Sequence, residues 1–114
     1  MNFADLLQSW AQASEPPRTA TAYSVRLPVE DAARLAALAD LYPGRSRDDM
    51  ITDLLGVALN GVTAALPYRP GPTVISTDDH GDPVYEDIGP TPRFMALARE
   101  HLHRLNAELA RRAR

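Results

Sequence analysis

The chain has 114 residues, a formal net charge of −3 and no cysteine, which excludes disulfide bonds, thiol catalysis and cysteine-ligated zinc. With 45% hydrophobic and 24% charged residues, the composition is that of a folded protein. Because no apolar run reaches the ~18 residues of a membrane span and the first residues lack the bases of a signal peptide, we expect a cytoplasmic protein without a membrane partner.

The first predicted element is an amphipathic helix within residues 1–14. Its apolar side chains recur at helical spacing: Phe3, Leu6, Leu7 and Trp10. Asn2 is placed to cap the first turn. A helix this short needs a surface to pack on, which is either the rest of this chain or a partner. Residues 15–20 contain two adjacent prolines and form a linker or arm.

Residues 21–27 alternate with a period of two, which predicts a β-strand. One face of the strand carries Tyr23, Val25 and Leu27. The other face carries Ala22, Ser24 and Arg26. Pro28 ends the strand, and the spacing of apolar residues predicts a helix from Val29 to Tyr42, terminated by Pro43 and Gly44.

A second helix of this region is predicted from Ser46, a capping residue, to Leu66. Its apolar residues nearly encircle the axis: Met50, Ile51, Leu54, Leu55, Val57, Ala58, Leu59, Val62 and Leu66. One neighbouring helix cannot cover such a surface in a chain this small, so the pattern predicts burial by a second subunit.

The C-terminal part is predicted to form a β-hairpin followed by a helix. Residues 67–90 contain a Pro/Gly-rich connection to residue 72 and then two β-prone runs around an acidic turn. In residues 91–114, Thr91 is the predicted cap and Pro92 the first helical residue. A 3-4 repeat then predicts a narrow apolar seam of Met95, Ala98, Leu102, Leu105 and Leu109. This last helix is basic, whereas the hairpin is acidic.

The order of strand, helix, Gly-containing turn and helix over residues 20–66 resembles the ribbon-helix-helix family of bacterial repressors. The residues that carry the resemblance are Val25-Arg26-Leu27-Pro28 before the first helix and Gly44-Arg45-Ser46-Arg47 before the second. The resemblance implies a mainly α fold with short β, in which two copies pair their strands into an antiparallel ribbon. That ribbon would insert its outer side chains into the major groove of double-stranded DNA.

Specific roles follow from this resemblance. Ala22, Ser24 and Arg26 would face the bases, and Arg26 would bind guanine O6 and N7. Arg45, Ser46 and Arg47 would contact phosphate. The dimer core would consist of Tyr23, Val25, Leu27, Ile51, Leu54, Leu55, Ala58 and Val62. The first functional hypothesis is therefore a homodimeric transcriptional regulator.

Three carboxylates oppose this hypothesis, because Asp48, Asp49 and Asp53 lie where a phosphate should approach. The alternative is a dimeric adaptor, antitoxin-like, that binds another protein through residues 73–114 and does not bind DNA. The whole chain also resembles a small bacterial family labelled "type 1 pili tip component", through the stretches that begin at Gly81 and Thr91.

No catalytic constellation is recognisable, so we expect no enzyme and no cofactor. The acidic turn of Asp78, Asp79, His80 and Asp82 lacks the spacing of a calcium loop and is interpreted as a polar hairpin tip, with no metal. His101 and His103 are two residues apart and point to different sides of a helix, so they cannot share a metal ion.

Overall fold

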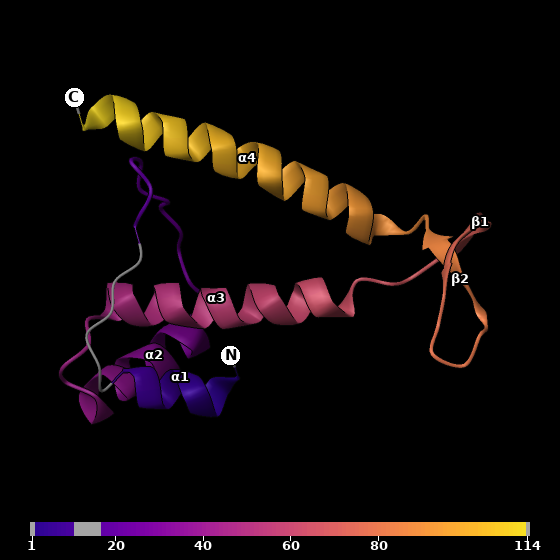
Figure 1. Cartoon of the computed structure of the whole chain (residues 1–114). Helices are drawn as coiled ribbons and strands as arrows, with labels where there is room; N and C mark the ends of the chain where they lie inside the picture. Colours follow the sequence, from indigo (N-terminus) through magenta and orange to yellow (C-terminus); the bar gives the residue numbers. More distant parts are fainter. Residues whose placement is uncertain (1, 11–16, 114) are drawn as a thin grey trace. The chain divides into compact units, whose positions relative to one another are not determined.

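A computed structural model of the chain describes residues 2–10 and 17–113, and in these residues four helices and one two-stranded antiparallel sheet are present (Figure 1). This confirms the prediction of a mainly helical protein with short β structure. The chain divides into two compact units, Met1–Val62 and Thr63–Arg114, with the boundary in the last turn of the third helix. Among the described helices, none is long and apolar enough to cross a membrane.

The first unit contains α1 (Phe3–Ser9), α2 (Val29–Leu41) and most of α3 (Arg47–Ala65). Both predicted caps are confirmed. Asn2 Oδ1 accepts a hydrogen bond from the Asp5 N–H at 2.8 Å, and Ser46 Oγ accepts one from the Asp49 N–H at 3.1 Å. These side chains satisfy N–H groups that no helical carbonyl can reach. Residues 11–14 of the first predicted helix lie outside the described residues.

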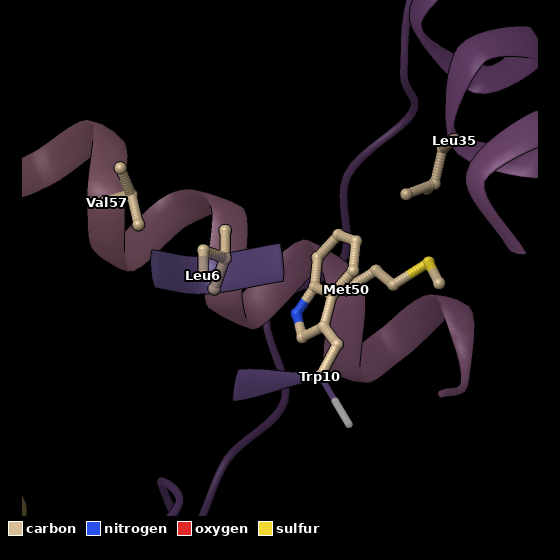
Figure 2. Close-up of a cluster of buried hydrophobic side chains, with 5 residues drawn as sticks. All are labelled: Leu6, Trp10, Leu35, Met50 and Val57. Carbon is tan, nitrogen blue, oxygen red and sulfur yellow. The ribbon is translucent and has the colours of Figure 1, made fainter. Parts of the chain in front are cut away.

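The core of the first unit consists of side chains from α1, α2 and α3 and of Trp10, the residue that follows α1 (Figure 2). Its buried members are Leu6, Trp10, Leu35, Met50 and Val57. Ile51 and Leu54, predicted as part of a dimer core, pack against this cluster within the chain. Met50 and Val57 were not predicted as residues of the dimer core and belong to this intrachain core, in which Met50 has the lowest exposed fraction of the described residues.

The opposite side of α3 is exposed. Leu55, Leu59 and Val62 are 56%, 51% and 60% exposed, at spacings of four and three residues, and Ala58 between them is also exposed. The helix therefore has two apolar faces, of which α1 and α2 cover one. This accounts for the apolar residues around its whole circumference.

The strand predicted at residues 21–27 is not formed within the single chain. Residues 22–28 belong to no helix or strand, and every one of them is exposed. Tyr23, Val25 and Leu27, the predicted dimer-core face of the strand, are 78%, 72% and 39% exposed. A strand needs hydrogen-bonding partners for its backbone, and the only strand pair of the described chain is β1 with β2.

In the second unit, β1 (Pro70–Thr77) pairs with β2 (Pro83–Asp87), so the predicted hairpin is confirmed. Strand β1 begins at Pro70, within the stretch that was expected to be an irregular connection. Asp78 closes the turn, because its carboxylate accepts hydrogen bonds from the N–H groups of His80 and Asp82, both at 2.9 Å. Gly81 has φ of +81°, a conformation that suits glycine.

Helix α4 spans Pro90–Arg112 and is capped by Gly89, so the predicted start at Thr91 and Pro92 is wrong by two residues. The physical reason is that Pro90 has a suitable fixed φ for the first helical position and needs no N–H there. The Gly89 N–H instead donates to Asp87 Oδ1 at 2.8 Å. In the described part of this unit no residue is buried, and Met95 and Leu102 of the predicted seam are 49% and 58% exposed.

Candidate nucleic-acid interface

The three side chains predicted to face bases lie in the exposed segment before α2. Ala22, Ser24 and Arg26 are all exposed. Within the part of the chain that the structure describes, Arg26 forms no ion pair, so its guanidinium is available for a ligand. Because Arg26 alternates with Val25 and Leu27, a strand formed here would place the arginine opposite the apolar face.

The predicted phosphate-binding residues lie at the start of α3. The Ser46 hydroxyl accepts the hydrogen bond from the Asp49 N–H, and Arg47, the first residue of the helix, is exposed. Arg45 differs from them, because its side chain is only 11% exposed and its guanidinium lies 2.7 Å from Asp53 Oδ2 and 3.8 Å from Asp49 Oδ2. A phosphate would have to compete with two carboxylates for Arg45.

A second arginine, Arg18 in the arm, contacts one of these two carboxylates, that of Asp49. Arg18 Nη2 lies 2.6 Å from Asp49 Oδ1, and Arg18 Nη1 donates to Thr52 Oγ1 at 2.9 Å. The indole nitrogen of Trp10 donates to the Asp53 carboxylate. Two guanidinium groups of the same unit therefore neutralise the charges of Asp49 and Asp53, and the Asp53 carboxylate also accepts a hydrogen bond from an indole N–H.

This charge cluster, defined by Arg18, Arg45, Asp49 and Asp53, changes the interpretation of the acidic residues. The sequence prediction treated Asp49 and Asp53 as groups that repel DNA. The structure shows that they hold the arm and the α2–α3 turn against α3. Their spacing of four residues places both carboxylates on the same side of α3, which is a signal that they could share an intrachain partner. Asp48 forms no ion pair in the described chain.

The second unit offers a different surface. On α4, Arg104 pairs with Glu108 at 3.0 Å and lies 3.4 Å from His101 Nδ1. In the described ranges, no group of three or more His, Asp or Glu side chains is arranged to hold a metal ion.

Comparisons with known proteins identify no relative. No family model matches the chain, and neither a curated protein nor a solved structure is significantly similar to it.

Proposed function

We propose that the protein is a homodimeric DNA-binding regulator of the ribbon-helix-helix kind. The observation that carries the proposal is the state of residues 22–28, which join no strand of the described chain and expose the alternating apolar residues Tyr23, Val25 and Leu27. Pairing this segment with its copy across a two-fold axis satisfies both backbones and buries that apolar face.

The outer face of α3 supports the same dimer. Leu55, Leu59 and Val62 form an apolar stripe in which each residue is more than half exposed. Burying a side chain of this kind contributes about 1.5–3 kcal/mol, so two copies that share this stripe add to the small core that each 114-residue chain has alone. The inner face of α3, with Met50 and Val57, already belongs to the core of each copy.

In the proposed dimer, the paired segment enters the major groove. Arg26 binds guanine, Ser24 contacts either base type and Ala22 touches a thymine methyl group. Arg47 and the capped start of α3 contact phosphate. Support for these roles comes from the exposure of Arg26 and Arg47 and from their lack of ion pairs in the described chain.

The proposal is tested by selecting preferred duplexes from a random pool and titrating binding with salt. We expect a defined sequence preference and an affinity that falls steeply with salt. Arg26→Ala should weaken discrimination at one base pair by roughly 1–3 kcal/mol. Arg34→Ala is the matched control, because Arg34 is an exposed arginine of α2 whose ion-pair partner among the described residues is Glu30, at 3.6 Å. Failure of any duplex to bind at low salt contradicts the proposal.

A second candidate function is favoured by the second unit. Its described residues include none that is buried, and α4 exposes Met95, Leu97 and Leu102. Exposed apolar helix faces of this kind are typical of protein–protein contacts. In this alternative the dimer is an adaptor, antitoxin-like, that binds a protein through the hairpin and α4 and does not bind DNA. A pull-down with and without nuclease separates the two, because a partner of the adaptor is retained after nuclease treatment.

A further inference from the structure

The charge cluster at the start of α3 contains two close ion pairs of different kinds, and a longer Arg45–Asp49 contact at 3.8 Å joins them. The Arg45–Asp53 pair is mostly enclosed, since the Arg45 side chain is 11% exposed and Asp53 also accepts from Trp10. The Arg18–Asp49 pair is open to solvent on the side of Arg18, whose side chain is 40% exposed. Exposed ion pairs are weak and exchange partners readily, whereas enclosed pairs resist separation.

Arg18 also lies close in sequence to the segment that the proposed function places on DNA. Only seven residues separate Arg18 from Arg26, and residues 17–28 belong to no helix or strand of the single chain. An arginine at this position can reach the DNA backbone beside the ribbon once it leaves Asp49. In the unbound chain, however, Asp49 Oδ1 and Thr52 Oγ1 occupy its two terminal nitrogens, at 2.6 Å and 2.9 Å.

We propose that the Asp49 carboxylate competes with DNA phosphate for Arg18. The carboxylate binds Arg18 in the unbound protein, and a DNA phosphate replaces it when the protein binds DNA. The inference rests on the proposed function and adds its regulation. Asp49 thereby lowers the affinity for every duplex alike, because a phosphate contact positions the protein without reading sequence. Arg45 stays with Asp53 throughout and keeps the turn before α3 in place.

The test is duplex binding by the full chain as wild type, Asp49→Asn, Arg18→Ala and the double variant. Asp49→Asn keeps the backbone N–H that bonds to Ser46 Oγ, so the helix cap is retained. We expect this substitution to raise the affinity for duplex DNA about two- to fivefold, which corresponds to the free energy of one exposed ion pair. Arg18→Ala should lower the affinity for duplex DNA. It should also reduce the magnitude of the slope of log binding constant against log salt concentration by about one. In the Arg18→Ala background, Asp49→Asn should then have little effect.

Glu30→Gln is the matched control, because it also removes one carboxylate from the first turn of a helix and breaks an ion pair, Glu30–Arg34. It should not reproduce the gain in affinity seen with Asp49→Asn.

The outcomes separate this inference from the proposed function. If duplexes bind but Asp49→Asn behaves like Glu30→Gln, or gains equally with and without Arg18, then Asp49 acts by general repulsion and the inference is overturned while DNA binding stands. If no variant binds any duplex, the proposed function and the inference both fail.

Discussion

The indole nitrogen of Trp10 donates a hydrogen bond to the carboxylate of Asp53, and this contact joins α1 to α3. The Trp10 ring also meets the ring of Tyr42 edge-on, with centroids 5.6 Å apart, at the end of α2. One side chain thus contacts both other helices of the first unit. A seven-residue helix such as α1 is unstable alone, so these tertiary contacts hold it in place.

Removing the Trp10 side chain should therefore weaken the first unit. Trp10 is 6% exposed, and truncating such a residue to alanine typically costs about 3–5 kcal/mol. We expect Trp10→Ala to lower the unfolding free energy by that order, measured by denaturant unfolding with circular dichroism. Phe3→Ala is the control on the same helix, because Phe3 is 57% exposed and should change stability by less than about 0.5 kcal/mol. Equal effects would contradict the assigned packing of α1.

Asp53→Asn should destabilise the fold through Arg45. The substitution removes the closer of the two carboxylates that pair with this mostly enclosed guanidinium, and the Asp49 carboxylate stays 3.8 Å away. Because Asp53 is partly exposed, the expected loss is about 1–3 kcal/mol, below that of a fully buried pair. Asp48→Asn is the control in the same helical turn and should lose less than about 1 kcal/mol, from the helix dipole alone. An Asp53→Asn variant no less stable than Asp48→Asn would refute this role.

Gly89 should tolerate no side chain. A Cβ atom on Gly89 would overlap the backbone carbonyl oxygen of Pro67, which cannot rotate away as a side chain can. We expect Gly89→Ala to cost about 1–3 kcal/mol locally and to speed hydrogen exchange of the Ile88 N–H, which bonds to the Arg69 carbonyl at 2.8 Å.

Gly61→Ala provides the opposite control. A Cβ atom at Gly61 meets nothing within 4 Å, so alanine inside α3 should stabilise the helix by roughly 0.5–1 kcal/mol. If Gly89→Ala leaves exchange at Ile88 unchanged, the tight approach between residues 67 and 89 is wrong.

The exposed face of α3 should control self-association. Leu55→Glu places a charge on the stripe proposed to meet a second copy but leaves the core residues Met50 and Val57 untouched. We expect the variant to sediment as a monomer with its helical circular dichroism retained. Leu41→Glu changes an equally apolar residue, 71% exposed at the end of α2, and should remain dimeric. Monomers of both variants, or dimers of both, would exclude this stripe as the interface.

Much of the fold could be predicted from local chemistry. The caps Asn2 and Ser46, the breaker Pro43 and the acidic turn at Asp78 act through neighbours a few residues away, and each lies where it was predicted. The start of α4 was missed because two prolines, Pro90 and Pro92, both suit a first turn.

The remaining features depend on contacts distant in sequence. Contacts with Leu6 and Trp10 decide which apolar residues of α3 face the core. Leu6 is more than 40 residues away from Met50 in the sequence. Likewise, the partners of Asp49 and Asp53 include Arg18 and Trp10, and no local pattern specifies that pairing. In the proposed dimer, residues 22–28 become a strand only by pairing with a second copy, and the sequence of one chain does not contain that partner.

We propose that two copies of the chain pair through residues 21–27 and the outer face of α3. Sedimentation equilibrium of the full chain at micromolar concentration, without DNA, tests it most directly. The proposed pairing predicts a mass twice that of the single chain. A single-chain mass together with the helical circular dichroism of a folded protein would contradict it.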